Sequence, residues 1–501
     1  MYAASSSKGG VASQIHLATL AGMEVLGEGG NAFDAAIAVS SVLTVLLPHT
    51  SSVGGDGFML AIDSSGEVIA YNGSGRAPRS FPVEQYLSKK PVRGPLTVTV
   101  PGLVDMWEWV SENHGSLDLS ATLARAISLA ANGFYVQEPL ARAVRESAPL
   151  LSACESWSRV FGHLSEGDHV RFPRLARILK LVAKRGADAF YRGRVAEELV
   201  EELRSSGVPI SYEDFAEHRG ERVEPVRASF GGYELYELPP NSQGVATLQL
   251  LKLMELDGLC EKPLRGPSWL ARFFELAAMV YEDRDRHVAD PDYYEPPLNE
   301  LLSRPHLERM LRRGPAPNRC GGGDTTFFVV ADGYGNLVGF IQSIFYAFGS
   351  GIVAGDVPFQ NRAAGFAKKP GLPNSPAPGK RPLHTLSILL ASHDARGTYI
   401  VGCAGGDYRP QIHAQVFANV ACYGMPLSTA VNAPRAILKS WGDEPSAIVE
   451  LGPWEGVPPW AQVVEYGSPE AGVVHALWRD RRGVVHLVAD VRGGGVAAPC
   501  V

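Results

Sequence analysis

The chain has 501 residues, a net charge of −7 and a pI of about 6.0, with 45% hydrophobic and 20% charged residues. These proportions are typical of a soluble globular protein. The acidic balance, without a long basic run, argues against nucleic-acid binding. Residues 1–10 lack the apolar core of a signal peptide, and the most hydrophobic segment, 35–47, is too short to span a bilayer. We therefore expect a cytoplasmic protein that contacts neither membrane nor nucleic acid.

The cysteines give no sign of a metal or cofactor site. None of the six belongs to a CxxC motif or to a cluster with histidine, which zinc sites and redox motifs would require. We expect no metal and no cofactor. The positions are Cys154, Cys260, Cys320, Cys403, Cys422 and Cys500.

The first part of the chain predicts two helices and a hairpin. Residues 14–26 have helical periodicity and end at a run of glycines. Asn31 and Asp34 then offer N-capping side chains for the apolar helix that follows. Two apolar strands separated by a polar, glycine-containing turn come next, at 58–62 and 68–71.

Helical periodicity dominates from residue 104 to about residue 251, apart from a strand-like segment at 233–238. Strand patterns then return, and a helical stretch at 411–424 separates the last two strand pairs. Strand-rich ends around a helical middle predict an α+β fold of sheets covered by helices, with no linker that would separate domains. The predicted pairs are 325–331 with 336–344, 386–391 with 398–403, and 473–478 with 483–489.

A glycine-rich segment, Gly321-Gly322-Gly323-Asp324-Thr325-Thr326, leads directly into an apolar strand. A hydroxyl at the start of a strand, behind conformationally free glycines, suits self-cleavage in which Thr325 attacks the carbonyl of Asp324. Cleavage would leave Thr325 with a free α-amine beside its own hydroxyl, so that nucleophile and base belong to one residue. The alternative is an ordinary hairpin entry with incidental threonines.

The hairpin that follows offers a partner for this threonine. Thr325 and Ser343 are equidistant from Tyr334, which lies in the turn 332–336. A symmetric register would place the two hydroxyl residues opposite each other, with their side chains on one face of the sheet. Ser343 would then orient the nucleophile by hydrogen bonding. The alternative is a cross-strand pair with only a structural role.

Three glycine-rich or charged segments are candidates for further sites. Gly405 and Gly406 lie between a predicted strand and a predicted helix, where paired backbone N–H groups suit stabilisation of an oxyanion. Residues 52–57 lack the Lys of a P-loop and precede a strand, which argues against nucleotide binding. The alternating charges at 283–286 predict a structural salt-bridge network.

A series of short motifs runs in order from residue 29 to residue 435: Gly29-Gly30-Asn31-Ala32-Phe33-Asp34-Ala35-Ala36, Gly54-Gly55-Asp56-Gly57, Val100-Pro101-Gly102, Pro239-Pro240-Asn241-Ser242-Gln243-Gly244, Asp283-Arg284-Asp285-Arg286, Gly323-Asp324-Thr325-Thr326, Phe348-Gly349-Ser350-Gly351, Lys380-Arg381-Pro382, Gly405-Gly406 and Asn432-Ala433-Pro434-Arg435. In these motifs the chain resembles the γ-glutamyltranspeptidase family of N-terminal-nucleophile hydrolases. The resemblance implies a four-layer αββα sandwich, self-cleavage before Thr325, and attack by Thr325 on an amide. It also implies that Gly405 and Gly406 form the oxyanion hole and that Ser343 supports the nucleophile.

The chain departs from the family pattern at substrate positions. The Arg that binds the substrate α-carboxylate in well-known γ-glutamyl enzymes aligns with Ser74, and the Asn after the supporting hydroxyl aligns with Phe345. The acidic residue for the α-amino group aligns with Gly365, and the usual Ser-Ser pair is His384-Thr385. These changes resemble the divergent acylase or amidohydrolase branch of the family, which includes oxamate-hydrolase-like members.

Two arginines remain near the substrate segments. Arg76 and Arg362 could each hold a carboxylate with two hydrogen bonds, and the alternative for each is a structural ion pair. The connection 366–380 is shorter than the lid-bearing loop of bacterial relatives, so we expect water rather than an amine to accept the acyl group.

Our first hypothesis is a self-processing amide hydrolase whose fragments, 1–324 and 325–501, remain one intertwined unit. Its substrate would be a small amide with a carboxylate in the acyl part, and whether the fragment pair dimerises again is open. One alternative is γ-glutamyl transfer or hydrolysis with glutathione as donor. The other is an uncleaved, non-catalytic family member that binds a small molecule or a partner.

Overall fold

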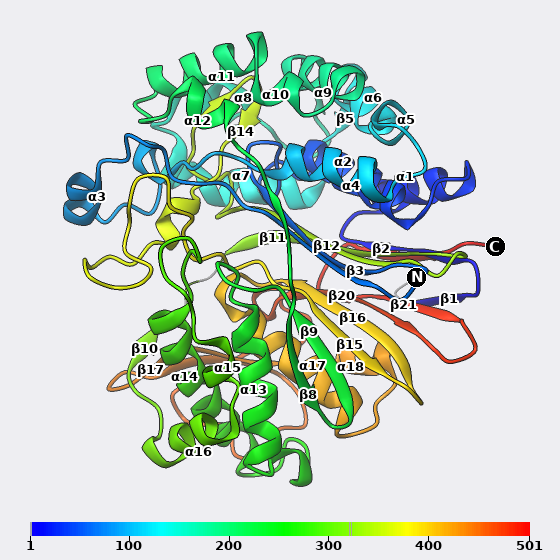
Figure 1. The fold of residues 1–501 in the computed structure, drawn as a ribbon, viewed down its shortest axis with the longest axis vertical. Coiled ribbons are helices and arrows are strands. Elements are labelled where there is room, and N and C mark those ends of the chain that lie inside the picture. Colours follow the sequence, from blue (N-terminus) through cyan, green and yellow to red (C-terminus); the bar gives the residue numbers. More distant parts are fainter. Residues whose placement is uncertain (1–2, 320, 322) are drawn as a thin grey trace.

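Two seven-stranded sheets lie face to face at the centre of the molecule, with helices on both outer sides (Figure 1). The computed structural model describes residues 3–319, 321 and 323–501, so Cys320 and Gly322 of the predicted sets lie outside the described residues. The first sheet has the order β22 (Val496–Pro499), β2 (Gly9–Ser13), β11 (Asp324–Asp332), β12 (Leu337–Phe345), β3 (Asp56–Ile62), β4 (Val68–Gly73) and β7 (Glu221–Val223). The second has the order β1 (Ala3–Ser6), β21 (Val485–Ala489), β20 (Val473–Arg479), β16 (Gly397–Ala404), β15 (Leu389–His393), β9 (Tyr233–Glu237) and β8 (Val226–Phe230).

Alternating side chains of β11 belong to two different cores. Phe327 and Val329 pack between the two sheets with residues such as Ile400 and Leu477 of the second sheet. Phe328 and its neighbours on the other face pack against the outer helices. A central strand buried on both faces explains why this segment is an unbroken apolar run.

The helices over the first sheet come from the first half of the chain. The most central, α2 (Ala32–Leu46), is buried along its whole length. Its N-terminus has the capping box that the sequence predicts, since Asn31 accepts from the N–H of Asp34 and Asp34 accepts from the N–H of Asn31. The other elements of this part are α1 (His16–Gly27), α3 (Val83–Lys89), η1 (Pro95–Thr97), α4 (Leu103–His114), α5 (Leu119–Thr122), α6 (Ala124–Asn132), β5 (Phe134–Tyr135), α7 (Glu138–Leu151), α8 (Glu155–Val160), β6 (His169–Val170), α9 (Pro173–Arg185), α10 (Asp188–Tyr191), α11 (Arg194–Ser205) and α12 (Tyr212–Ala216).

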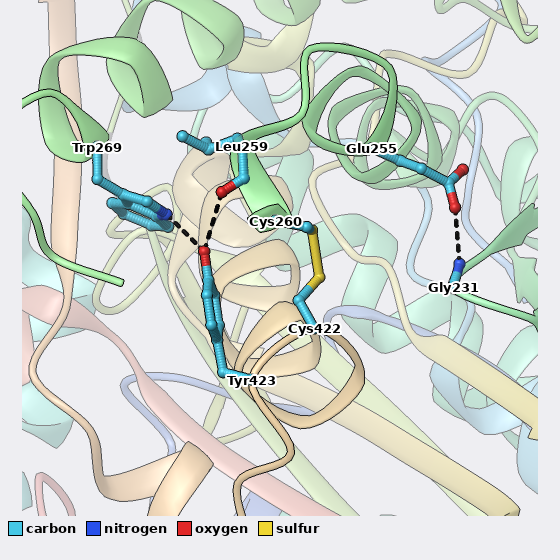
Figure 2. Close-up of a disulfide and its surroundings, with 7 residues drawn as sticks. All are labelled: Gly231, Glu255, Leu259, Cys260, Trp269, Cys422 and Tyr423. Atoms are coloured by element: carbon cyan, nitrogen blue, oxygen red, sulfur yellow. Dashed lines mark hydrogen bonds between the residues drawn. A yellow bond between two sulfur atoms is a disulfide. The ribbon is translucent and has the colours of Figure 1, made fainter. Parts of the chain in front are cut away.

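The second sheet is covered by α13 (Gly244–Leu256), α14 (Trp269–His287), α17 (Arg409–Ala421) and α18 (Leu427–Asn432). A disulfide between Cys260 and Cys422 joins the connection after α13 to the C-terminal end of α17 (Figure 2). The remaining elements are η2 (Leu259–Glu261), α15 (Leu298–Leu301), α16 (Arg304–Arg313), β10 (Asn318–Arg319), β13 (Val353–Ala354), β14 (Val357–Pro358), η3 (Arg362–Gly365), η4 (Gly406–Tyr408), β17 (Ala436–Trp441), β18 (Ser446–Glu450), β19 (Ala461–Val464) and η5 (Pro469–Ala471).

Both sheets combine strands from before and after the Asp324–Thr325 bond. In the first sheet β11 pairs with β2 on one side and with β12 on the other. In the second, β9 pairs with β15 and β1 pairs with β21. The segments 1–324 and 325–501 are therefore intertwined rather than separate domains.

Most predicted elements are present, and the differences are strands and helices, such as α14, that the sequence did not predict. The helices near residues 14–26 and 31–47, the hairpin of β3 and β4, and the three later strand pairs are all found. The prediction of a mainly helical middle is wrong near its end, where the two further strands β7 and β8 precede β9. Also unpredicted are β1, β2 and the four-stranded sheet of β10, β17, β18 and β19. No helix in the described part of the chain is both long and apolar enough to cross a membrane.

Candidate active site

The carbonyl oxygen of Asp324 accepts hydrogen bonds from two hydroxyl groups. Thr325 Oγ1 donates to it at 2.5 Å and Ser343 Oγ donates to it at 2.6 Å. Thr325 and Ser343 are both buried, and Asp324 is partly exposed. The Thr325 hydroxyl is therefore held beside the carbonyl group of the bond that the sequence identifies as the cleavage point.

The register of the β11–β12 hairpin is symmetric about Tyr334 except at Thr325. Thr326 pairs with Gln342, as a symmetric register requires, but Asp324 pairs with Phe345 because a bulge interrupts the ladder between Asp324 and Thr326. The expected direct pairing of Thr325 with Ser343 is therefore wrong. The bulge instead turns the backbone so that both hydroxyls meet at the Asp324 carbonyl oxygen.

Ser343 is itself oriented by the residue that ends β12. Phe345 has a φ of 82°, a left-handed conformation that is strained for a side chain with a Cβ. In this conformation the N–H of Phe345 donates to Ser343 Oγ at 2.8 Å. The Ser343 hydroxyl proton is thereby directed to the Asp324 oxygen. Strain of this kind is typical of functional sites.

Gly405 and Gly406 lie at the end of β16, directly before α17. Within the described residues, neither glycine N–H donates to another protein acceptor. The loop lies against the segment before the nucleophile, since a Cβ placed on Gly323 would be 3.2 Å from the Gly406 Cα. Gly405 and Thr325 line the same cavity.

Residues of two further motifs hold this glycine turn in place. Gln243 Nε2 donates to the carbonyl of Gly406 at 3.1 Å, and Gln243 Oε1 accepts from Arg284 at 3.0 Å. Arg284 also forms an ion pair with Asp407 at 3.3 Å, and Asp407 accepts from the N–H of Gly321. The charged segment 283–286 thus has the structural role that the sequence predicts, and one of its ion pairs supports the site.

Two residues that the sequence reasoning missed contact Thr325. Arg409, the first residue of α17, donates from Nη2 to Thr325 Oγ1. Gln14 donates from Nε2 to the Thr325 carbonyl at 3.2 Å. The sequence offers one indication for Arg409, which is its position directly after the glycine turn. A side chain at the start of the following helix lies near a group bound at that turn.

A cavity of about 1090 Å³ opens onto Thr325. One wall is α7, which contributes Glu138, Arg142 and Glu146, and the opposite wall is formed by residues around Glu470. The cavity therefore has room for a small-molecule substrate, with side chains of both charges on its walls.

Arg362 is buried beside this site with two nitrogens unpaired. Its side chain is 0% exposed, its Nη1 donates to Thr385 Oγ1 at 3.2 Å, and its guanidinium lies 4.3 Å from the centre of the Phe345 ring. Nε and Nη2 have no hydrogen-bond partner among the described residues. These two N–H groups share one edge of the guanidinium, the edge that binds a carboxylate with two parallel bonds. Burial lowers the pKa of Arg362 to about 9, so the group is charged at neutral pH.

Thr385 connects Arg362 to Thr325 through Arg409. Its hydroxyl accepts from Arg362, and its carbonyl accepts from Arg409, which in turn contacts Thr325 Oγ1. Of the expected substrate residues, Thr385 thus contacts both arginines, and Phe345 lies against Arg362. Another, His384, is buried with Nε2 bonded to Asp56 at 3.1 Å, and burial lowers its pKa well below the ordinary value.

Ser74 and Arg76 do not reach the cavity at Thr325. Ser74 is buried, donates to Asn72 at 2.6 Å and lies within 3.3 Å of Asn241. Arg76 pairs with Asp290 at 3.3 Å and with Asp292 at 2.6 Å. Of the two alternatives open for Arg76, the structure therefore favours the ion pair. The sequence could not predict these pairs, because the carboxylates at 290 and 292 are more than 200 residues from Arg76.

Gly365 lacks space for an acidic side chain. A Cβ at this position would be 2.6 Å from the carbonyl oxygen of Leu383. Contacts this short essentially exclude a side chain unless the backbone moves. The position that the resemblance assigns to an acidic residue therefore has no room for one.

Comparison with known proteins identifies the family. Residues 18–500 match the family model for gamma-glutamyltranspeptidase. The chain belongs to this family. It is 32% identical to the glutathione hydrolase-like YwrD proenzyme of Bacillus subtilis, over 97% of both chains, and 31% identical to the oxamate amidohydrolase proenzyme of Klebsiella pneumoniae, over 98% of both. The glutathione hydrolase proenzyme of Escherichia coli is 29% identical over 86% of this chain and 81% of that one.

A solved structure gives the same result for the fold. The cephalosporin acylase from Bacillus halodurans superimposes with a TM-score of 0.87 at 28% identity, covering 100% of this chain and 97% of that one. The four-layer sandwich of the N-terminal-nucleophile hydrolases is thereby confirmed, as is the expectation of an enzyme of the γ-glutamyltranspeptidase class.

Proposed function

We propose that the chain cleaves itself between Asp324 and Thr325 and that Thr325 then hydrolyses a small amide whose acyl part carries a carboxylate. The observation that supports self-cleavage best is the shared hydrogen bonding of the Asp324 carbonyl oxygen by Thr325 and Ser343. One hydroxyl is the attacking group, and the other polarises the carbonyl that is attacked.

In the proposed cleavage, Thr325 Oγ forms a bond to the carbonyl carbon of Asp324 and the Asp324–Thr325 C–N bond breaks. The hydroxyl proton ends on the released α-nitrogen, so the product of this step is an ester between Asp324 and the Thr325 side chain. Water hydrolyses the ester, which frees the Asp324 carboxyl group and restores the Thr325 hydroxyl. Ser343 donates to the oxygen that becomes negative during the attack.

The mature residue then repeats the same chemistry on an external amide. Its α-amine takes the hydroxyl proton, which suits an amine with an ordinary pKa of about 7.7–8.0. The N–H groups of Gly405 and Gly406, which have no acceptor among the described residues, are the candidates for binding the new oxyanion. An acyl-enzyme ester forms, the amine product leaves, and water releases the acid.

The carboxylate preference rests on Arg362. A buried charged group with unpaired donors is costly, so a ligand that pairs with Nε and Nη2 would be stabilised there. In the uncleaved chain Gly323 lies against Phe345, whose ring covers Arg362. Withdrawal of the segment ending at Asp324 would therefore open a path from the cavity to Arg362.

The fragments would remain joined after cleavage. Cys260 lies before the proposed cleavage point and Cys422 lies after it, so their disulfide links the two fragments covalently. The shared sheets hold them together as well. The proposed mature enzyme is thus a heterodimer, and whether that pair associates further is for light scattering to decide.

An activity screen on the mature protein tests this function. We expect hydrolysis of short amides with an anionic acyl group, such as oxamate or glutaryl amides, in preference to γ-glutamyl amides. The uncleaved Thr325→Ala variant should be inactive on all of them. Efficient transfer from glutathione to a dipeptide acceptor, at rates comparable to hydrolysis, would instead favour the γ-glutamyltransferase alternative. A stable uncleaved chain with no activity would favour the non-catalytic alternative.

A further inference from the structure

Arg409 places a fixed positive charge on the oxygen of the proposed nucleophile. The side chain is 0% exposed. Nε donates to the Cys403 carbonyl at 2.8 Å, and Nη1 donates to the carbonyls of Gly406, at 3.0 Å, and Thr385. Nη2 donates to Thr325 Oγ1. Three backbone carbonyls thus fix the guanidinium plane, and the fourth direction is taken by the Thr325 hydroxyl.

The charge of Arg409 is not neutralised by a direct ion pair. Among the described residues no carboxylate oxygen lies within 4.0 Å of its guanidinium, although Asp407, Glu237 and Asp324 act on it from farther away. Burial lowers the pKa of Arg409 to about 10, so the group remains protonated at neutral pH. A buried cation without a direct ion pair is costly to maintain, and a structural role does not require that it contact a hydroxyl.

We propose that Arg409 is a catalytic residue that activates Thr325, both in self-cleavage and in amide hydrolysis. The inference rests on the proposed role of Thr325 as the nucleophile. As the hydroxyl loses its proton, negative charge develops on Oγ, and a hydrogen bond from a guanidinium to a charged oxygen is stronger than one to a neutral hydroxyl. Arg409 therefore stabilises the attacking form more than the resting form.

Arg409 has a second effect in the mature enzyme. The α-nitrogen and Oγ of Thr325 are separated by only two carbon atoms, so the new α-amine lies close to the same guanidinium. A neighbouring positive charge disfavours protonation and lowers the pKa of an amine below its ordinary range of about 7.7–8.0. A larger share of the amine is then available as a base at neutral pH.

Of the other charged groups around Thr325, Arg362 is a second buried cation and acts on Arg409 from a distance, whereas most of the rest are paired. On α7, Arg142 and Glu146 act on Asp324 in opposite directions. Across the cavity, Lys439 pairs with Glu470 at 3.2 Å. His49 is buried with its pKa lowered to about 3, so it is neutral near pH 7. Three more charged groups line the cavity. Glu138 forms an ion pair with Arg142, and Arg492 forms one with Glu450. Arg93 donates to two backbone carbonyls. Arg409 is the cation in direct contact with Thr325.

The test uses the full-length Arg409→Met and Arg409→Lys variants. Self-cleavage is followed over time on reducing gels, and the pH dependence of kcat/KM is measured on whatever matures. Circular dichroism and thermal unfolding establish that each variant is folded. Arg272→Met serves as a matched control, because Arg272 lies on α14 and pairs with Asp257, away from the cavity.

We expect Arg409→Met to slow self-cleavage by about 100-fold, the effect of losing one preorganised donor to a developing anion. In mature protein it should lower kcat and shift the acidic limb of the pH profile to higher pH. Arg409→Lys keeps the charge and should keep the pH profile while losing turnover, because its amine cannot reproduce the fixed fork. Arg272→Met should match the wild type in cleavage rate and pH profile.

Wild-type cleavage, turnover and pH profile in folded Arg409→Met would overturn the inference. If that variant does not fold, wild-type cleavage and kcat in Arg409→Lys would overturn it equally. Both results leave the proposed function intact as long as Thr325→Ala is inert. Cleavage or turnover by Thr325→Ala would instead overturn the proposed function itself.

Discussion

The hydroxyl of Ser343 lies 2.6 Å from the carbonyl oxygen of Asp324 and donates to it, although the two residues are 19 positions apart. In the proposed self-cleavage, the same oxygen carries the charge that develops as Thr325 attacks. Ser343→Ala should therefore slow self-cleavage by about 100-fold, as expected for loss of one oxyanion donor. Cleavage time courses on reducing gels measure this effect, and Ser343→Thr should restore part of the rate.

Thr326→Ala is the control for the Ser343 and Thr325 variants. Thr326 is the neighbouring buried threonine, and its hydroxyl is directed to the Gln342 carbonyl at 3.4 Å rather than to Asp324. Cleavage and turnover should change little. If Thr326→Ala slowed cleavage as much as Ser343→Ala, loss of the hydrogen bond to the Asp324 carbonyl would not explain the slower cleavage of either variant.

Gly405→Ala should lower kcat more than it raises KM. An added Cβ would lie 2.6 Å from Ile412 Cδ1 and 3.3 Å from Cys403 Sγ, so either these side chains or the turn must move, and movement of the turn would displace its N–H groups. An interaction that strengthens in the transition state affects kcat in this way. Steady-state kinetics of the mature variant measure both constants. An unchanged kcat with a raised KM would indicate that the added methyl group only obstructs substrate binding.

Arg362→Lys should weaken the use of anionic substrates selectively. A lysine cannot make the paired bonds of Nε and Nη2, and loss of a hydrogen bond to a charged group costs about 1.5–3 kcal/mol, or roughly 10- to 150-fold in kcat/KM. The loss should vanish with a matched substrate whose carboxylate is a methyl ester. Equal losses on both substrates would show that Arg362 has only a structural role.

The disulfide predicts different gel patterns with and without reductant. Because Cys260 and Cys422 lie on opposite sides of the cleavage point, mature protein should run as one species of about the full 53.8 kDa without reductant and as two bands with it. Cys422→Ser should give two bands under both conditions. Two bands from the wild type without reductant would mean that the bridge is not formed in solution.

Asp324 predicts how the stability of the uncleaved protein depends on pH. Burial raises the pKa of Asp324 from 3.8 to about 6, so the folded precursor holds this proton more tightly than the unfolded chain. Its contribution to the free energy of unfolding is full below pH 3.8 and falls as the pH rises toward 6. Urea unfolding of Thr325→Ala across this range should show a larger fall than the Thr325→Ala/Asp324→Asn double variant. Identical pH dependence in the two proteins would contradict the assignment.

The sequence predicted the hairpin that carries the nucleophile but not the geometry at its end. Two apolar strands of equal length around Tyr334 define the register from Thr326 onward, and the structure has that register. The bulge at Thr325 depends on the positive φ of Phe345, which no local pattern predicts for an aromatic residue. Ser343 therefore lies within hydrogen-bonding distance of the Asp324 carbonyl, its supporting role remains a prediction, and its expected position opposite Thr325 was wrong.

The other features that the sequence did not predict depend on contacts between residues far apart in the chain. The position of Arg409 could not be predicted because it depends on the carbonyls of Thr385 and Cys403, which are 18 residues apart in sequence and meet only in the folded protein. The strands β1 and β2 consist of Ala, Ser, Gly and one Val, residues with little intrinsic strand preference, and they form because β21 and β11 offer free edges for pairing. The sequence offered Arg76 and Arg362 equally as candidates for binding a substrate carboxylate. The structure distinguishes them, because Arg76 is ion-paired and Arg362 is buried with two nitrogens that have no partner among the described residues.

The central claim is that the chain cuts itself before Thr325 to create its own nucleophile. The most direct test is N-terminal sequencing of the smaller band from a reducing gel of freshly purified, active protein, with Thr325→Ala run beside it. The account predicts a fragment that begins Thr-Thr-Phe-Phe, and a single uncut band for the variant. An active protein that remains uncut, or a fragment that begins at any other residue, would contradict it.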